Sequence, residues 1–249
     1  MRQFPKKCKY KINPNYFDTI DTEAKAYWLG MIFADGSVQY DPDKRRYALV
    51  LQSKDKWIVE NLRDALDSAH PIKEIQGSGF NTETIHYRLN LTSQLLVKKL
   101  IEYKPNSNNI IIPVMPASLV HHFIRGFFDG DGSVYTYRKK GITKHYYNVY
   151  KLADGTKVKK PYDIPKEYPY DYEAIECSII ACEYMQQDLL KNLKLANIKT
   201  RIKKSKTAWM NYVVISNKPA VKAFYNYLYR DATVYLPRKH NVFTTHYAP

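Results

Sequence analysis

Two aspartates, Asp35 and Asp131, occupy matching positions in two similar segments of the chain. Residues 27–38 read YWLGMIFADGSV and residues 123–134 read FIRGFFDGDGSV, so each aspartate follows an apolar helical run and precedes Gly-Ser-Val. Carboxylates are disfavoured at helix C-termini, where the dipole is already negative, and two carboxylates placed together repel each other. A divalent cation between them would offset both costs, and Mg²⁺ favours such oxygen ligands together with water and phosphate oxygens.

A metal held between the two aspartates would support cleavage of phosphodiester bonds. Bound metal lowers the pKa of a water molecule and stabilises the leaving oxygen of an in-line phosphoryl displacement. Two acids would serve two scissile phosphates, which predicts one cut in each strand. A single Asp-Gly after a helix is usually only a capping turn, but a second copy in matching context favours the functional interpretation.

The acidic run at 129–132 also resembles the start of a calcium loop. That pattern requires glycine where Val134 stands and glutamate where Lys140 stands, so we exclude it. Asp129 corresponds to Phe33 in the first segment. We therefore interpret Asp129 as a local cap or helper and not as an essential ligand.

The two segments are predicted to form helices that pack directly against each other. Each has two small residues four positions apart, Gly30 and Ala34 in the first segment and Gly126 and Gly130 in the second. Small residues at this spacing let helix backbones approach closely. We expect the helices to pair about a pseudo-twofold axis, with their C-terminal ends side by side and capped by Gly36 and Gly132.

Similar elements follow each segment, which predicts an α+β fold of two αββαββα repeats, 1–113 and 114–249. The first repeat shows strand patterns near 37–40, 46–52, 72–76 and 85–91 and helix patterns near 54–67 and 93–103. The second shows strand patterns near 133–138, 173–181, 199–204 and 209–215 and helix patterns near 184–196 and 219–229. Helical and strand periodicities distinguish the two kinds of element.

The second repeat carries an insertion at about 139–172 between its first two strands. This segment contains eight lysines, seven tyrosines and an Ala-Asp-Gly turn at 153–155. The turn chemistry favours a basic β-ribbon, and a solvated loop is the alternative. The first repeat instead has the longer loop between its last two strands, around residues 77–79.

At residues 28–36 and 124–132 the chain resembles the LAGLIDADG homing endonucleases, whose nine-residue motif both segments match position by position. The resemblance implies an intron-encoded monomer with the motif helices at its central interface. It implies two four-stranded antiparallel sheets that form a saddle over double-stranded DNA. It also implies metal-dependent cleavage of both strands at a long, pseudo-palindromic site.

The resemblance assigns roles to individual positions. Asp35 and Asp131 would be metal ligands, and Ala34 and Gly130 would be further metal-contacting positions. The expected cofactor is Mg²⁺, with Mn²⁺ able to substitute and Ca²⁺ able to bind without cleavage.

The family also places a basic or amide group near each scissile phosphate, at the ends of the second and fourth strands. Here Gln52 ends the second strand of repeat 1, and Lys218 follows the fourth strand of repeat 2. The repeat-2 counterpart of Gln52 falls near Glu183, and the repeat-1 counterpart of Lys218 is Gln94. The two halves are therefore expected to differ around the metals and to cut at different rates. An ordinary helix-start lysine is the alternative for Lys218.

Polar residues alternate with apolar ones along the predicted strands, which would give each sheet a polar face for DNA. Arginine can read guanine and asparagine adenine in the major groove, while lysine mostly contacts phosphate. The candidate DNA contacts are Arg46, Lys73, His86, Arg88, Asn90, Arg138, Lys199, Arg201, Lys203 and Asn211.

Composition agrees with a polyanionic partner. The 249 residues include 39 Lys or Arg and 24 Asp or Glu, a net charge of +15, and such an excess is typical of nucleic-acid binding. Residues 114–249 carry +11 of this charge and residues 1–113 carry +4, so we expect the second half to hold phosphate more strongly. No apolar run is long enough for a membrane helix.

The three cysteines, Cys8, Cys177 and Cys182, have no metal spacing and fit a reducing intracellular compartment, either a prokaryotic or phage-infected cytoplasm or an organelle. No signal peptide is evident. The histidines show no metal-ligand spacing, and we interpret His121 and His122 as structural.

Two other functions fit the same pattern. An intron maturase or a non-cleaving binding protein would keep the saddle, and intron RNA would then be a partner. The presence of both motif acids favours the endonuclease. An intein-borne nuclease is disfavoured, because the chain starts at Met1 and no splice-junction residues are present at its ends.

Overall fold

The structure is a computed structural model that describes residues 9–44, 46–76, 84–104, 110–206 and 209–247. The first half contains α1 (Glu23–Asp35), β1 (Gly36–Asp41), β2 (Arg46–Ser53), α2 (Lys56–Ala65), β3 (Ile72–Gln76), β4 (Ile85–Thr92) and α3 (Gln94–Tyr103). A 3-10 turn (Ala117–Leu119) leads into the second half. This half contains α4 (Val120–Asp131), β5 (Gly132–Lys151), β6 (Lys157–Cys182), α5 (Glu183–Leu195), β7 (Arg201–Lys204), β8 (Met210–Ile215), α6 (Lys218–Tyr229) and α7 (Pro237–Tyr247).

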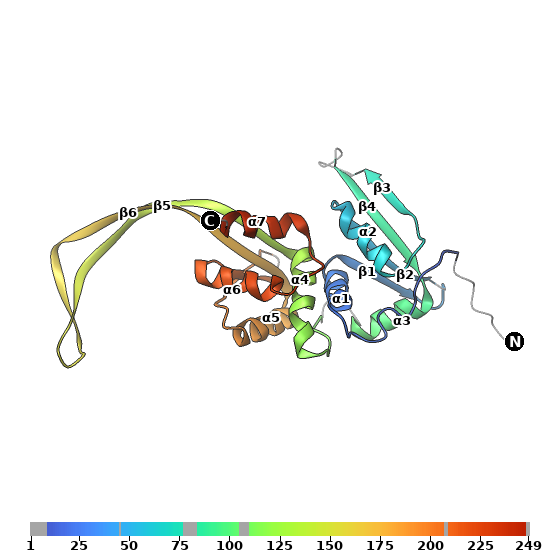
Figure 1. The fold of residues 1–249 in the computed structure, drawn as a ribbon, viewed down its shortest axis with the longest axis horizontal. Coiled ribbons are helices and arrows are strands. Elements are labelled where there is room, and N and C mark those ends of the chain that lie inside the picture. Colours follow the sequence, from blue (N-terminus) through green and yellow to red (C-terminus); the bar gives the residue numbers. More distant parts are fainter. Residues whose placement is uncertain (1–8, 45, 77–83, 105–109, 207–208, 248–249) are drawn as a thin grey trace.

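Each half is built on one four-stranded antiparallel sheet. The strand orders, β1-β2-β4-β3 and β5-β6-β8-β7, are the same topology repeated. The predicted α+β fold with two αββαββα repeats is therefore confirmed. Figure 1 shows α1 and α4 side by side between the two halves, with a sheet extending to either side. The predicted longer loop around 77–79 lies outside the described residues.

The two central helices differ from the others in how they are buried. Side chains all around α1 are buried, because α1 packs on its own sheet and on α4 at once. An outer helix such as α2 buries only one face, with Ile58, Val59 and Leu62 inside, as expected of an amphipathic helix. Thr22 caps the start of α1, where its hydroxyl accepts a hydrogen bond from the Lys25 backbone N–H at 3.3 Å.

The strand registers show which residues of the two halves are equivalent. Gly36 pairs with Leu51, and Gly132 pairs with Ile179, so the repeat-2 counterpart of Gln52 is Ile180. The expected counterpart near Glu183 is therefore wrong. The expectation rests on aligning a leucine of α2 with a leucine of α5. Leucines one helical turn apart have the same periodicity, so such an alignment can be wrong by a whole turn and then misplaces the preceding strand. Strand pairing has no such ambiguity.

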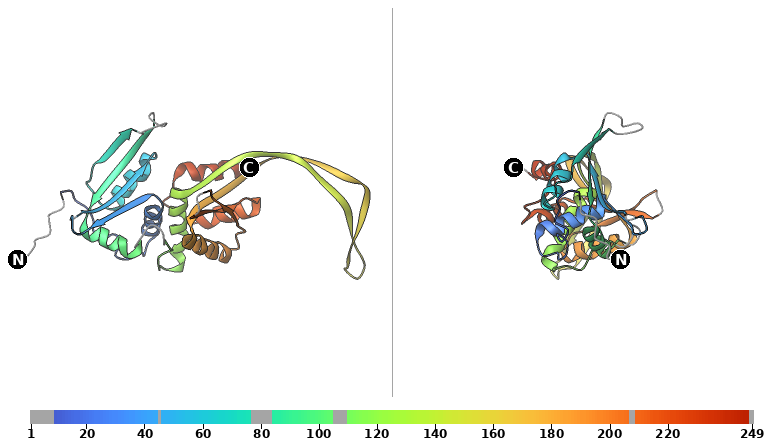
Figure 2. Two further views of the ribbon diagram at one scale, coloured as in Figure 1. Left: turned by 180° about the vertical axis from the view of Figure 1, so that it is seen from behind. Right: turned by 90° about the vertical axis from the view of Figure 1, so that its right-hand side faces the viewer.

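Strands β5 and β6 continue far beyond their sheet as a two-stranded ribbon. Pairing runs from Gly132 with Ile179 out to Lys151 with Lys157, with a β-bulge between His145 and Tyr147. The ribbon includes the insertion at 139–172, which forms a ribbon and not a solvated loop. It extends the molecule along its longest axis, on the side away from the first half (Figures 1 and 2).

Helix α7 was not expected from the sequence. It begins at Pro237, which suits the first turn of a helix, and it packs against β5 with Phe243 fully buried. No helix among the described residues is long and apolar enough to cross a membrane.

Candidate active site

The backbones of α1 and α4 touch where they cross. A Cβ atom added at Gly30 would collide with the Phe123 carbonyl, and one added at Gly126 would collide with the Tyr27 carbonyl. Any side chain at either position would push the helices apart. The predicted glycine strips therefore do face each other.

This crossing brings the C-terminal ends of the two helices together. Near the ends, a Cβ atom at Gly130 would collide with that of Ala34 and would lie 3.3 Å from Oδ2 of Asp35. Gly36 and Gly132 are the C-caps, as predicted, although both adopt extended conformations. Glycine is needed at these caps because a Cβ atom would strike Ile32 or Phe128 of the preceding turn.

Asp35 and Asp131 lie together at these helix ends and influence each other electrostatically. Burial among the surrounding protein, and after it the nearby Asp35 carboxylate, raise the pKa of Asp131 to about 6. Burial likewise raises the pKa of Asp35. Both side chains remain reachable by solvent. Among the described residues, neither carboxylate has an ion pair or a hydrogen-bonded side chain.

Two lysines that the sequence analysis missed occupy the ends of the same helices. The Lys104 amine donates to the carbonyls of Ile32, Phe33 and Gly36 at 3.0–3.2 Å. The Lys239 amine, from α7, donates to four carbonyls at the end of α4: Phe128 (2.6 Å), Asp129 (2.8 Å), Gly130 (3.5 Å) and Gly132. Each amine thus places a positive charge at the negative end of a helix dipole.

The environment of these lysines also shifts their acidity. Burial lowers the pKa of Lys239 to about 8, against the opposing attraction of Asp129, Asp35 and Asp131. Burial lowers the pKa of Lys104 as well, and there too Asp131 and Asp35 oppose the shift. The acid pair and the two amines therefore form one electrostatic cluster.

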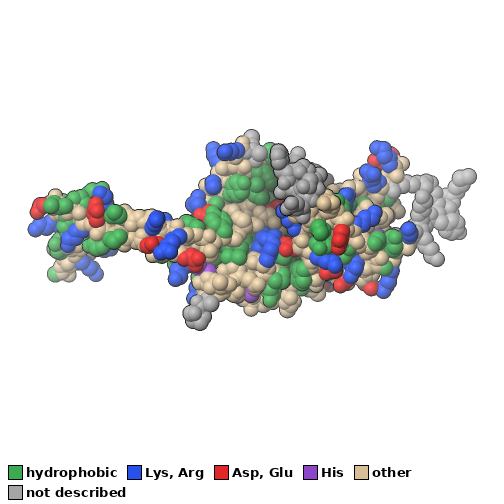
Figure 3. All heavy atoms as spheres, turned by 90° about the horizontal axis from the view of Figure 1, so that it is seen from above, with side chains coloured by type: hydrophobic (Ala, Val, Ile, Leu, Met, Phe, Trp, Pro, Cys, Tyr) green, Lys and Arg blue, Asp and Glu red, His purple; other side chains and the backbone are tan. Residues whose placement is uncertain are grey.

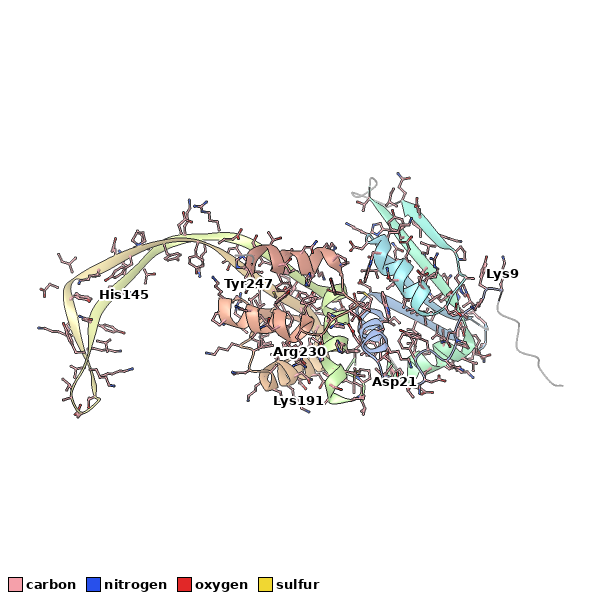
Figure 4. All side chains as sticks on the ribbon, viewed as in Figure 1. Lys9, Asp21, His145, Lys191, Arg230 and Tyr247 are labelled. Carbon is pink, nitrogen blue, oxygen red and sulfur yellow. The ribbon has the colours of Figure 1, made fainter. Side chains whose placement is uncertain are left out.

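The structure does not bring Lys218 to this cluster. Lys218 starts α6, and its carbonyl accepts a hydrogen bond from the Tyr247 hydroxyl. Tyr247 lies at the far end of α7 (Figure 4). Lys239 lies two turns earlier on α7, so the predicted role of Lys218 beside Asp131 is wrong. Lys239 reaches the α4 end from the extra helix, whereas α6 contacts α4 near its own opposite end, where the Leu228 carbonyl accepts from Arg125.

Gln52 does lie close to its expected place. It follows Leu51, the partner of Gly36, so it sits at the end of α1 on the exposed side of β2. Ile180, its counterpart beside Gly132, has an apolar side chain. The two half-sites thus differ, because only one has an amide at this position.

The candidate DNA contacts of the first sheet share its outer face. Leu49 pairs with Leu91 and Leu51 with Leu89, and all four are buried against the helices. By strand alternation, the intervening side chains point away from the core. The residues on this outer face include Arg46, Gln52, Lys73, His86, Arg88 and Asn90. Lys73, Arg88 and Asn90 line one hollow there, together with Tyr10 and His70.

The second sheet confirms only part of the expected arrangement. Arg201 and Lys203 of β7 point to its outer face, and the exposed Lys199 precedes that strand. Arg138 and Asn211 fall on the opposite face, in phase with the buried Ile175 and Val213, so their placement on the DNA-facing side is wrong. Because side chains alternate between the two faces of β5 and β8, Arg138 and Asn211 point away from the outer face. Arg138 forms an ion pair with Asp171 at 2.7 Å.

The acid pair fits a divalent cation. The expected ligand atoms are the oxygens of the Asp35 and Asp131 carboxylates and of the Ala34 and Gly130 carbonyls, all hard oxygens of the kind that Mg²⁺ prefers. The Gly130 carbonyl also accepts a long hydrogen bond from Lys239 at 3.5 Å. The two carboxylates repel each other and have no neutralising partner within ion-pair distance among the described side chains. A cation between them would relieve that repulsion.

Asp129 helps to hold α4 in place and does not belong to the acid pair. It accepts hydrogen bonds from the Tyr27 hydroxyl at 2.9 Å and from the Leu236 backbone N–H at 2.8 Å. Burial raises the pKa of Asp129 to about 6. These contacts join both halves and agree with its interpretation as a helper.

His121, His122 and Asp231 form a cluster whose ligand atoms lie within 4.8 Å of one another. Arg125 donates to Nδ1 of His122 at 2.7 Å, so the neutral imidazole must carry its proton on Nε2. His122 therefore cannot ligate a metal through Nε2, because a ligating histidine needs an acceptor beside its other nitrogen and Nδ1 of His122 faces the Arg125 donor instead. The cluster is therefore structural.

No protein-family model matches the chain, and no curated protein matches it. Among solved structures, the chain is similar to the homing endonuclease I-WcaI bound to its DNA recognition sequence, with 16% identity, a TM-score of 0.54, and coverage of 91% of this chain and 89% of that one. It is similar to the I-SmaMI LAGLIDADG homing endonuclease bound to cleaved DNA, with 13% identity, a TM-score of 0.54, and coverage of 90% and 87%. It is also similar to I-DmoI in complex with DNA and Mn, with 14% identity, a TM-score of 0.51, and coverage of 85% and 98%. The chain therefore has the fold of the LAGLIDADG homing endonucleases, in the single-chain form with two repeats.

Proposed function

We propose that this chain is a monomeric, site-specific endonuclease that cuts both strands of a long, pseudo-palindromic DNA target. The observation that carries the proposal is the meeting of Asp35 and Asp131 at the ends of two crossed helices, between two sheets with polar outer faces. The likeness in fold to DNA-bound homing endonucleases supports the same activity.

The proposed cofactor is a divalent cation held by Asp35 and Asp131, with the carbonyls of Ala34 and Gly130 beside them. Magnesium is the expected ion, and the manganese in the I-DmoI complex supports a divalent site. When bound, the cation would supply charge neutralisation and a more acidic water molecule for phosphodiester hydrolysis. Ca²⁺ is expected to support binding without cutting.

The residues around the acids would assist the same reaction. The positive charges of Lys104 and Lys239 lie where negative charge would grow on the scissile phosphates, and such preorganised charge lowers the barrier. Because its pKa is about 8, the Lys239 amine can hold or release a proton near neutral pH. Gln52 can donate its amide to a phosphate oxygen, whereas Ile180 cannot, so the two strands would be cut at unequal rates.

The outer faces of the sheets would recognise the target. Arg88 and Asn90 in the first sheet, and Arg201 in the second, carry the donor groups that read purine edges in the major groove. Lysines such as Lys73 and Lys203 would hold phosphates and make binding dependent on salt. Intron RNA is the second proposed ligand of the same faces.

A two-stage selection tests the proposal. A randomised DNA library would be bound in calcium, retained, and then exposed to magnesium, with an Asp35→Asn, Asp131→Asn double variant in parallel. The proposal predicts enrichment of one long site that only the wild type cuts in both strands. If both proteins enrich the same site and neither cuts it, the saddle is a binding module. If no DNA is enriched, structured intron RNA becomes the ligand.

A further inference from the structure

The two faces of the β5–β6 ribbon carry different chemistry. Strand pairing from Lys139 with Tyr172 to His145 with Lys166 fixes which side chains share a face. One face, which we call the aromatic face, carries Lys139, His145, Lys166, Tyr168, Tyr170 and Tyr172. Gly141 also lies on this face, where the Tyr170 ring crosses it so closely that a Cβ atom would come within 2.6 Å of the hydroxyl.

The acidic side chains of this stretch lie on the other face. Glu167 pairs with Lys144 at 2.6 Å, Asp171 with Arg138 at 2.7 Å, and Glu173 contacts His246 of α7 at 3.2 Å. These ion pairs neutralise the acidic side chains of that face, and among its basic side chains in this stretch Lys140 has no ion pair with a described residue. On the aromatic face, neither Lys139 nor Lys166 has an ion pair with any described residue, so both charges are available to a partner.

The aromatic face runs without interruption into the outer face of the second sheet. Tyr135 and Tyr137 follow the same alternation as Lys139, one strand repeat nearer the sheet. The Tyr135 hydroxyl donates to Glu176 at 2.7 Å, and Arg201 donates to the same carboxylate at 3.0 Å. The ribbon thus prolongs the surface that carries Arg201 and Lys203.

Neighbouring tyrosines on this face lie against one another. Ring centroids of Tyr135 and Tyr137 are 5.9 Å apart, and those of Tyr170 and Tyr172 are 5.8 Å apart. Tyrosine hydroxyls and lysine amines are both donors to phosphate oxygens.

We propose that the aromatic face of the ribbon binds the phosphate backbone of double-stranded DNA flanking the target, on the side of the second repeat. The ribbon extends along the longest axis of the molecule, and green and blue side chains cover much of it in Figure 3. A two-stranded ribbon also fits the width of a DNA groove. This inference rests on the proposed function for its choice of partner, and it adds a second contact region beyond the saddle.

Charge-matched variants of the two faces test the inference. Lys139→Gln with Lys166→Gln removes two charges from the aromatic face, and Lys140→Gln with Lys144→Gln removes two from the opposite face. All four lysines are exposed, and thermal melting would verify that both variants fold like the wild type. The affinity of each protein for a mixed-sequence 60-base-pair duplex would be measured by fluorescence anisotropy over a range of salt, without magnesium.

The inference predicts that the slope of log affinity against log salt becomes shallower by about 1.8 for the aromatic-face variant, as expected for two lost phosphate contacts. The opposite-face variant should keep the wild-type slope. Equal slopes for the two variants would overturn the inference. So would a difference seen only with a single-stranded RNA of the same length, which would make RNA the partner. Because the duplex has no target and no cutting is measured, failure here is distinct from failure of the endonuclease proposal.

Discussion

Each motif helix ends where negative charge accumulates, because a carboxylate stands beside carbonyls that have no helical partner. Lys104 and Lys239 relieve this by donating directly to those carbonyls. An ammonium group has three donors, and each of these amines has at least three carbonyl acceptors. That match explains how Lys239 can be buried, and Lys104 half-buried, beside the site.

Replacing Lys239 by methionine should therefore destabilise the protein although the side chain keeps its length. The carbonyls of Phe128 and Asp129 would lose their donor, and leaving buried polar groups unpaired costs about 1–3 kcal/mol. Chemical denaturation would measure the change in the free energy of unfolding. Lys222→Met on the exposed side of α6 is the matched control and should have little effect. Equal stability of the two variants would show that the cap contributes nothing.

His122 should make the stability depend on pH. Burial, and after it the nearby Arg125 guanidinium, lower the pKa of His122 to about 4. In the unfolded chain, His122 binds a proton when the pH falls below its ordinary pKa of 6.5, whereas in the folded chain it binds that proton only near pH 4. Stability attributable to His122 is therefore complete above the unfolded pKa and falls as the pH drops through this window.

His122→Asn keeps an acceptor near the position of Nδ1 and removes the titration. Between about pH 7 and about pH 5 the wild type should lose on the order of 1 kcal/mol more than this variant. Denaturant titrations at several pH values would measure the difference. His145→Asn on the exposed ribbon should follow the wild type, and an identical pH profile for all three proteins would refute the assignment.

Individual site residues were predictable only where a local pattern marks them. Asp35 and Asp131 stand in a repeated motif, so their meeting could be inferred from two short segments. Lys104 and Lys239 have no such mark, because they reach the site from other helices and contact backbone atoms. Arg138 was misplaced because a one-residue step along a strand moves a side chain to the opposite face.

Among the elements, the crossing of α1 and α4 sets the geometry of the site. Close backbone contact fixes how far apart their ends lie, so the glycines at the crossing determine the separation of the two acids. The buried Arg125 of α4 reinforces the contact by an ion pair with Glu23 of α1 at 2.6 Å.

Alanine at Gly126 should push the helices apart. The added methyl would meet the Tyr27 carbonyl, which is backbone and cannot rotate away, and overpacking of this kind costs about 1–3 kcal/mol. Gly141→Ala is the control, because there the methyl would meet only the end of the Tyr170 side chain. Differential scanning calorimetry should show a clearly lower melting temperature for the first variant alone. Similar temperatures for both would mean that the helices can adjust.

Elements with a strong periodic pattern were predicted well, and those defined by distant contacts were not. The strands of the first half and the helices that follow them appear close to the expected positions. Helix α7 was missed, since its first turn, Pro237 to His240, shows no apolar repeat and its burial depends on the fold around it. The counterpart of Gln52 required the strand register, which no single segment contains.

At the scale of the whole molecule, the two halves are similar in topology and different in chemistry. They share one hydrophobic core and are joined by ion pairs such as Arg238 with Asp55 at 2.8 Å. The second half alone carries the ribbon and α7, and it holds most of the net positive charge. Under the proposed function, this asymmetry would suit a DNA target whose two halves are not identical.

Strand-resolved cleavage of the selected DNA site would test the central claim most directly. The wild type, Asp35→Asn and Asp131→Asn would each be incubated in magnesium with a duplex labelled differently on its two strands. Binding in calcium would verify that both variants still recognise the site. The proposed mechanism predicts that the wild type cuts both strands and that each variant loses the cut in a different strand. If either variant still cuts both strands at the wild-type rate, or if both lose the same strand, the acid pair does not act as proposed.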